Sequence, residues 1–160
     1  MQMRYVSLSI LGNPPQKMTQ PFDQNSISYY EENSDVFISK TAGADLSHLY
    51  KVFLKNIPAG GRILDLGCGS GRDSKIFKKK YYEVVAVDAS AKMVEATRRI
   101  TKADARVMCF DELRFVEEFD GIWACASLLH VPENQLPSVL EKCLQALRKT
   151  GVMYLSFKHG

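Results

Sequence analysis

The stretch Ile63-Leu64-Asp65-Leu66-Gly67-Cys68-Gly69-Ser70-Gly71-Arg72-Asp73 runs from apolar residues through three alternate glycines into polar ones. A second apolar stretch, residues 83–88, ends on Asp88, which stands 23 residues after Asp65. Glycine permits positive φ angles and lets another group approach the main chain where a Cβ would block it. The pattern predicts a strand, a nucleotide-binding turn, a helix and a second strand that ends on an acid.

The spacing of the glycines distinguishes between kinds of nucleotide. The dinucleotide fingerprint is G-x-G-x-x-G, and it places a pyrophosphate at a helix N-terminus. Here Gly71 comes one position early and Arg72 stands where the fingerprint has its third glycine, while no G-K-[ST] indicates a P-loop. Asp65 favours a cationic ammonium or sulfonium over a phosphate, because a carboxylate favours positive charge nearby. The alternative is a generic strand-turn-helix in which the Asp only caps the helix.

Apolar and amphipathic segments alternate through the rest of the chain. Near-continuous apolar strands separated by amphipathic helices predict an α/β fold with a parallel sheet covered on both faces. Two further helices are expected before the first strand, one starting at Ser26 and one over about residues 44–56. The expected strands lie near 62–67, 83–88, 105–109, 119–125 and 151–157, and the expected helices between them near 72–80, 90–101 and 133–149.

The N-terminal part is expected to form an arm over residues 1–24, followed by one domain over residues 25–160. Within the arm, residues 6–10 alternate apolar and polar, as in a half-buried strand. The chain is 46% hydrophobic and 24% charged, which is ordinary for one soluble domain. No apolar run approaches the ~20 residues that span a bilayer, and no secretion signal is found, so we expect a cytoplasmic protein without membrane contact.

Charge and cysteine usage narrow the possible partners. The four cysteines include no C-x-x-C pair, so no metal site is expected. The formal net charge of +3 is too small to predict nucleic-acid binding. The basic run at residues 78–80 is interpreted as the solvated C-terminal end of a helix, where cations complement the helix dipole.

The glycine turn resembles the first motif of the class I S-adenosylmethionine-dependent methyltransferases, which has the form acidic-x-G-x-G-x-G. Residues 65–71 match it at every fixed position. The resemblance implies a Rossmann-like, doubly wound parallel sheet of five strands in the order 3-2-1-4-5, without the strands 6 and 7 of the complete fold. It also implies that S-adenosyl-L-methionine is the cofactor, that Asp65 and the turn hold its methionine end, and that Asp88 binds both ribose hydroxyls.

Three further segments resemble the small bacterial methyltransferases of the tellurite-resistance type. They are Gly-Ser-Gly-Arg-Asp at 69–73, Trp-Ala-Cys-Ala-Ser-Leu-Leu-His-Val-Pro at 123–132 and Leu-Ser-Phe-Lys at 155–158. The likeness extends over about residues 26–160 and implies that Tyr29, Tyr30 and Arg72 lie near the open end of the cofactor pocket. Arg72 is expected either to pair with the methionine carboxylate or to be a solvated residue at the helix start.

The resemblance implies the remaining candidate residues as well. His130 is expected to be a substrate contact or base, because an unperturbed histidine pKa near 6.5 suits proton transfer at neutral pH, with Tyr30 beside the acceptor; the alternative is that His130 only packs beside the following helix. Phe110 is expected either to stack on the adenine or to fill the core, and the Asp usual for this class aligns with Cys109 instead of Asp111. The full set expected to bind the cofactor is Asp65, Gly67, Cys68, Gly69, Gly71, Arg72, Asp88, Ala89, Met93, Phe110, Asp111, Ala124 and Cys125.

The sequence stops at Gly160, directly after the fifth expected strand. This leaves the edge at residues 152–157 without the antiparallel strand pair of the complete fold, and an open apolar edge calls for a cover. A second copy of the chain, a partner protein or the arm at residues 6–10 could supply it, and a homodimer is favoured.

The sequence leads to two hypotheses about function. The first is a methyltransferase acting on a small-molecule acceptor. The alternative is a non-catalytic, truncated methyltransferase-like module that binds a partner protein, or itself, through the exposed edge of strand five.

Overall fold

The computed structural model describes residues 24–41 and 43–157. The expected arm, with its strand pattern at residues 6–10, lies outside these ranges apart from Gln24. The strands are β1 (Arg62–Leu66), β2 (Glu83–Asp88), β3 (Asp104–Val107), β4 (Phe119–Cys125) and β5 (Leu147–Ser156). The helices are α1 (Gln24–Glu32), α2 (Ser34–Thr41), α3 (Ser47–Leu54), α4 (Arg72–Lys79), α5 (Ala91–Thr101) and α6 (Leu136–Ala146), with 3-10 turns η1 (Phe110–Glu112) and η2 (Leu128–His130).

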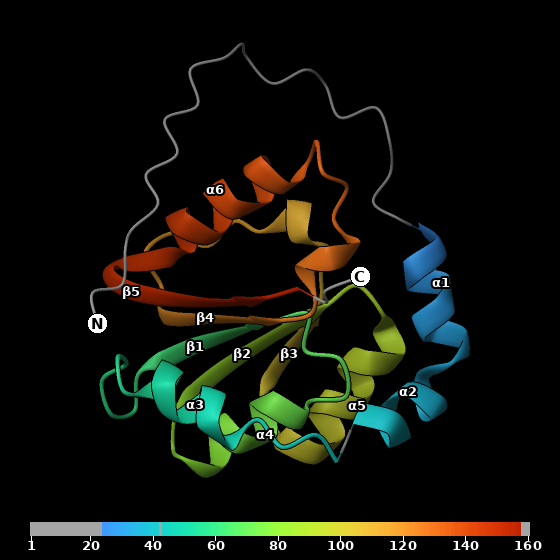
Figure 1. Cartoon of the computed structure of the whole chain (residues 1–160), viewed down its shortest axis with the longest axis horizontal. Helices are drawn as coiled ribbons and strands as arrows, with labels where there is room; N and C mark the ends of the chain where they lie inside the picture. Colours follow the sequence, from blue (N-terminus) through green and yellow to red (C-terminus); the bar gives the residue numbers. More distant parts are fainter. Residues whose placement is uncertain (1–23, 42, 158–160) are drawn as a thin grey trace.

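The strands form one parallel sheet in the order β3-β2-β1-β4-β5. The expected five-stranded order is therefore confirmed. Helix α6 covers one face, and α3, α4 and α5 cover the other, while α1 and α2 lie beside α5 (Figure 1). In the parts of the chain that the structure describes, no strand pairs with the outer edge of β5.

Alternate side chains of the central strands enter two separate cores, because successive residues of a strand point to opposite faces. Leu64 and Leu66 of β1 pack in the core below α6, together with Ile122 of β4. Ile63 and Trp123 pack on the other face with α3 and α4. Burial on both faces explains why these strands read as continuous apolar runs rather than as alternating ones.

Trp123 is the centre of the second core. Its ring stacks on Tyr154 of β5 at 4.0 Å between centroids, and it meets Tyr50, Phe53 and Phe77 at 5.1–5.5 Å. These partners come from α3, α4 and β5, so one ring joins two helices to the sheet. Aromatic pairs of this kind contribute beyond the area that they bury.

The prediction for the last helix was wrong in extent. The final helix, expected over 133–149, ends at Ala146, and residues 147–149 belong to β5. The carbonyls of Gln145 and Ala146 accept backbone hydrogen bonds from Glu117 and Glu118, and Leu147 pairs with Phe119. Sheet pairing therefore overrides the helical apolar stripe at this point.

The short helix expected from Ser26 is α1, which begins two residues earlier, and α2, which follows it, was not predicted. Asn33 separates them: its main-chain N–H and its side-chain Nδ2 both donate to the carbonyl of Tyr29, at 2.9 and 3.0 Å. The helix expected over 44–56 is shorter, and the Asp45 carboxylate accepts from the N–H of its first residue, Ser47, at 2.9 Å.

Replacement of Phe77 by alanine removes a ring that is fully buried against Trp123 and Tyr50. We expect the free energy of unfolding, measured by urea denaturation, to fall by about 3 to 5 kcal/mol. Val116→Ala is the control, because Val116 is 69% exposed, and its effect should stay within about 0.5 kcal/mol. Equal losses in the two variants would contradict the placement of Phe77 in the core.

Candidate cofactor site

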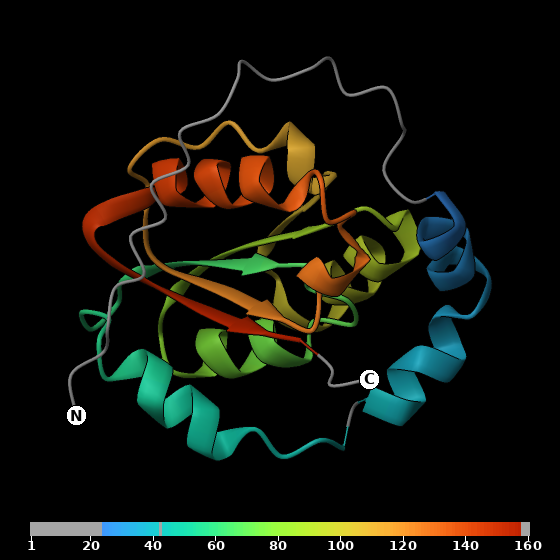
Figure 2. The same cartoon turned by 45° about the horizontal axis from the view of Figure 1, so that its top comes forward.

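The site lies where the strand order of the sheet reverses, between β1 and β4. The chain moves outward from β1 to β2 and β3, and then returns to the other side of β1 with β4 and β5. Ligands of open α/β sheets bind in the crevice outside the carboxyl ends of the strands at such a point. Three features lie there: the glycine turn after β1, Asp88 at the end of β2 and Cys125 at the end of β4. Helix α1 lies beside the neighbouring helix α5 (Figure 2).

The glycine turn is held by the carbonyl of Val87 on β2. The main-chain N–H groups of Gly67 and Cys68 donate to it at 2.8 and 2.9 Å. The φ angles are positive at all three glycines, +78°, +50° and +80° at 67, 69 and 71. A Cβ at Gly67 would lie 2.3 Å from the Cβ of Ser127, and one at Gly71 would lie 2.8 Å from Oγ1 of Thr97. Packing within the protein therefore requires glycine at 67 and 71, whether or not a ligand is bound.

Asp65 lies beneath this turn and is almost completely buried. Its Oδ2 accepts from the N–H and the hydroxyl of Ser74 in α4, at 3.1 and 2.6 Å. This is the helix-capping contact that was the alternative interpretation. Burial, and then the negative charge of Asp73, raise the pKa of Asp65 above its ordinary value. A nearby cation would favour the ionised form, so the two interpretations are compatible.

Asp88 joins the turn to the end of β2. Its Oδ2 accepts from the N–H of Gly69 and its Oδ1 from the N–H of Ser90, both at 2.9 Å. Burial raises its pKa, which the two backbone hydrogen bonds partly offset. Each carboxylate oxygen offers two lone pairs, so both oxygens keep the capacity to accept from ribose hydroxyls. This geometry fits the expected role of Asp88.

Helix α1 reaches the same corner through Glu31, which the sequence did not indicate. Its carboxylate accepts from the Ser90 hydroxyl at 2.7 Å and from the N–H of Lys92 at 3.3 Å. Lys92 Nζ donates in turn to the Glu31 carbonyl at 2.6 Å. The start of α5 next to Asp88 is therefore tied to α1.

Arg72 is not a solvated helix-start residue. Its Nε and Nη2 donate to Asp73 Oδ1 and Oδ2 at 2.6 and 3.0 Å, and Nη2 lies 3.7 Å from the Cys125 sulfur. Asp73 was not among the predicted site residues. The guanidinium thus connects the start of α4 to the end of β4 across the crevice.

The segment after β3 packs against the glycine turn. Phe110 is buried in the core below α6, and its Cζ would lie 3.4 Å from a Cβ at Gly67. Filling the core is therefore confirmed for Phe110, and its stacking on adenine stays a prediction. Oδ1 of Asp111 is buried without a hydrogen-bond partner among the described residues, although buried acceptors usually have one.

The remaining predicted residues are placed as follows. Cys68, Met93 and Ala124 are buried, while Ala89, Cys125 and His130 are half-buried. His130 closes η2, directly after β4, and its N–H donates to the Ser127 carbonyl at 3.4 Å. The backbone of Tyr30 belongs to α1, and its place beside the acceptor stays a prediction. The hydroxyl of Ser127, which was not predicted, is buried with no hydrogen-bond partner in the described chain.

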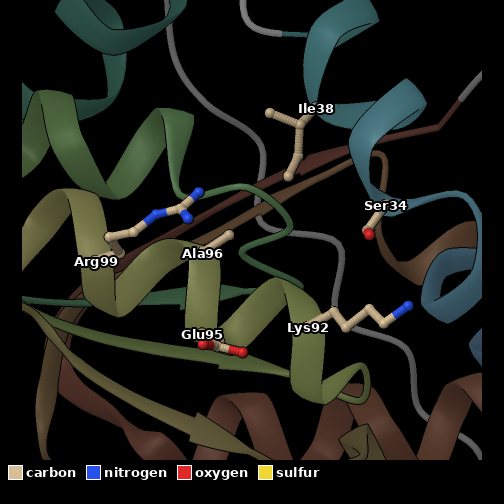
Figure 3. A pocket seen from close by; sticks show the side chains of 6 residues that line it. All are labelled: Ser34, Ile38, Lys92, Glu95, Ala96 and Arg99. Carbon is tan, nitrogen blue, oxygen red and sulfur yellow. The ribbon is translucent and has the colours of Figure 1, made fainter.

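A separate cavity of about 300 Å³ lies between α2 and α5. Ser34 and Ile38 of α2 face Lys92, Ala96 and Arg99 of α5 across it (Figure 3). Within residues 24–41 and 43–157, no cluster of His, Cys, Asp and Glu could hold a metal ion. In the same residues, no helix is long and apolar enough to cross a membrane.

The fold and this turn define a Rossmann-like domain with a nucleotide-type cofactor at the switch point of its sheet. A family model described as a methyltransferase domain matches residues 63–151, which contain the glycine turn, Asp88 and all of β4. The chain belongs to this family, the class I S-adenosylmethionine-dependent methyltransferases, and S-adenosyl-L-methionine is the cofactor.

Similar proteins agree with this assignment. A ubiquinone biosynthesis O-methyltransferase of Xanthomonas axonopodis pv. citri is 29% identical over 106 residues, covering 62% of the chain and 44% of the relative. One of Xylella fastidiosa is 26% identical over 159 residues, covering 87% and 64%. The chain thus spans only part of the length of these relatives. The solved structure of a TehB-like methyltransferase of Corynebacterium glutamicum is 21% identical, with a TM-score of 0.68, over 76% of this chain and 72% of that one.

Gly67→Ala combines a positive φ with an overlap against Ser127, so it should reduce the free energy of unfolding by about 2 to 5 kcal/mol. In a Ser127→Gly background the overlap is relieved, and the loss should fall to the backbone strain of about 1 to 2 kcal/mol. Gly60→Ala is a matched control, because φ there is +73° and the nearest heavy atom is 4.0 Å away. Urea denaturation measures all four variants, and a loss at Gly67 no larger than at Gly60 would contradict the close approach.

Asp65→Asn tests the raised pKa of the buried carboxyl. A folded-state pKa above the unfolded value means that the folded state binds more protons, so this contribution to stability falls as pH rises. The variant lacks the effect, and its stability relative to wild type should increase between pH 5 and pH 8 by at least about 1 kcal/mol. Asp104→Asn is the contrasting control, because the Arg106 hydrogen bond lowers the pKa of Asp104. A lowered pKa affects stability only near and below the ordinary carboxyl range around pH 4, so the relative stability of Asp104→Asn should stay constant between pH 5 and pH 8. Parallel pH profiles for the two variants in this range would refute the raised pKa of Asp65.

Proposed function

We propose that the chain is a methyltransferase that transfers the methyl group of S-adenosyl-L-methionine to a small-molecule acceptor. The observation that carries the proposal is the joint position of the glycine turn and Asp88, whose carboxylate binds the N–H of Gly69 at the switch point of the sheet. The family match covers this region. Because the chain spans only part of the relatives' length, we do not infer that it acts on the same acceptor as they do.

We propose the following roles for the residues of the site. The turn and Asp65 hold the methionine end, because the buried carboxyl stabilises a cation that approaches from the turn. Asp88 accepts hydrogen bonds from the ribose hydroxyls. Phe110 and Asp111 flank the adenine. Oδ1 of Asp111, which has no partner among the described residues, accepts a hydrogen bond there. Cys109, which aligns with the usual Asp, does not accept this hydrogen bond.

The acceptor lies on the side of η2 and α1, where His130 and Tyr30 are the candidate base and contact. When bound, the cofactor supplies an activated methyl group on its sulfonium. The protein then has to align an in-line attack and exclude water, and His130 takes the acceptor's proton where the acceptor carries one. A homodimer or partner at the β5 edge would add a wall to this side of the site.

Asp88→Ala should weaken binding of S-adenosyl-L-methionine by about 1 to 3 kcal/mol through the lost hydrogen bonds. Isothermal titration calorimetry measures the change. Asp104→Ala is the control, since this carboxylate pairs with Arg106 on the exposed β3 edge and should leave affinity unchanged. An Asp88→Ala protein that binds as tightly as the wild type would refute the ribose assignment.

The reaction itself is tested by incubation with the cofactor and with thiol, oxyanion and amine acceptors, followed by quantification of S-adenosylhomocysteine. Formation that depends on one acceptor class supports the enzyme. Cofactor binding without turnover on any class would favour the non-catalytic module instead.

A further inference from the structure

The Asp73 carboxylate accepts four hydrogen bonds from three side chains. Its Oδ1 accepts from the Tyr50 hydroxyl at 2.5 Å and from Arg72 Nε at 2.6 Å. Its Oδ2 accepts from the Trp123 indole at 2.8 Å and from Arg72 Nη2 at 3.0 Å. A carboxylate offers about four lone-pair sites, so these contacts use its full accepting capacity and fix its orientation.

Two of these donors belong to the rigid aromatic core. Tyr50 and Trp123 are buried, and their rings lie 5.3 Å apart. Tyr50 comes from α3 and Trp123 from β4, so the carboxylate is held from outside its own helix. The position of Asp73 therefore depends on the core and not on the first turn of α4 alone.

The fixed Asp73 carboxylate orients Arg72 through a bidentate pair of hydrogen bonds. An arginine side chain carries about 2 kcal/mol of rotamer entropy, and a planar two-point contact removes most of this freedom before a ligand binds. The guanidinium also approaches the Cys125 sulfur at the end of β4. A cation is thus held in a defined orientation between the ends of β1 and β4, where the ligand of such a sheet binds.

Stability is a poor explanation for a charge pair in this place. The Asp73 side chain is 9% exposed and that of Arg72 22%, and removing two charges from water costs about as much as their attraction returns. A guanidinium carries five N–H donors, of which the Asp73 carboxylate accepts from two. The arrangement suits an anionic group of a ligand at the switch point.

We propose that Asp73 is a positioning residue that holds the Arg72 guanidinium in place for the carboxylate at the amino-acid end of the cofactor. The inference rests on the proposed function, because it assigns one part of the same site. Asp73 touches no reacting atom and acts only through Arg72.

Two probes separate this role from a general structural one. S-adenosylhomocysteine contains the amino-acid end, whereas 5′-methylthioadenosine keeps the adenosine and the thioether without it. Calorimetry with Asp73→Asn should show an affinity for S-adenosylhomocysteine about 10- to 100-fold below wild type, since a hydrogen bond to a charged group is lost. The affinity for 5′-methylthioadenosine should be unchanged.

Phe53→Leu is the matched control. Phe53 packs on Trp123 in the same aromatic core, and its side chain carries no hydrogen-bond donor for Asp73. Its melting temperature should fall, while the ratio of the two affinities should stay that of the wild type. Arg72→Gln should show the same selective loss as Asp73→Asn, and the double variant should show no further selective loss, because the two residues act as one unit.

The outcomes are distinct. Equal loss of affinity for both ligands in Asp73→Asn, or no loss, would overturn the positioning role. A further selective loss when Asp73→Asn is added to Arg72→Gln would overturn it as well. If Asp73→Asn does not fold, Arg72→Gln decides alone, and an unchanged affinity ratio there overturns the proposal. A wild-type protein that binds neither probe would instead contradict the proposed function.

Discussion

The pairing of β1 with β2 on one side and with β4 on the other is the constraint on which the rest of the structure depends. Asp65 is registered against Ala86 of β2 and against Trp123 of β4. Because both neighbours are parallel to β1, all three strands end at one edge, and the turn after β1 meets the Val87 carbonyl and the Asp88 carboxylate there. A shift of one residue in either pairing would move every side chain of that strand to the opposite face.

The same pairing brings charges into the interior. Asp65, Asp73 and Asp88 approach the glycine turn from β1, α4 and β2, and burial is the main cause of the raised pKa values of Asp65 and Asp88. A site that collects buried carboxylates is costly without a ligand and becomes favourable when a cation enters. The hydrogen bonds of Ser74 and Gly69 to these carboxylates reduce the cost without neutralising the charge.

Local patterns predicted the strands and the turn well, because the glycines at 67, 69 and 71 and the apolar runs express short-range requirements. They failed where a distant segment competes for the same backbone. The apolar stripe of the last helix continues to Leu147, yet β4 and the residues before it draw the chain into the sheet. The site was predicted in the same way: Asp88 follows from its strand, whereas Glu31, Asp73 and Ser127 have no local pattern that marks them.

The sequence by itself determined the order of strands and helices, the glycine turn and the two acids that identify the cofactor, since each depends on neighbours within a few residues. The tertiary structure alone decided what those residues touch. Gly67 requires glycine because Ser127, 60 positions away, packs against its Cα, and Arg72 is oriented because Tyr50 and Trp123 hold Asp73 from α3 and β4. Contacts between segments far apart in sequence arise only when the sheet has assembled, and no periodicity records them.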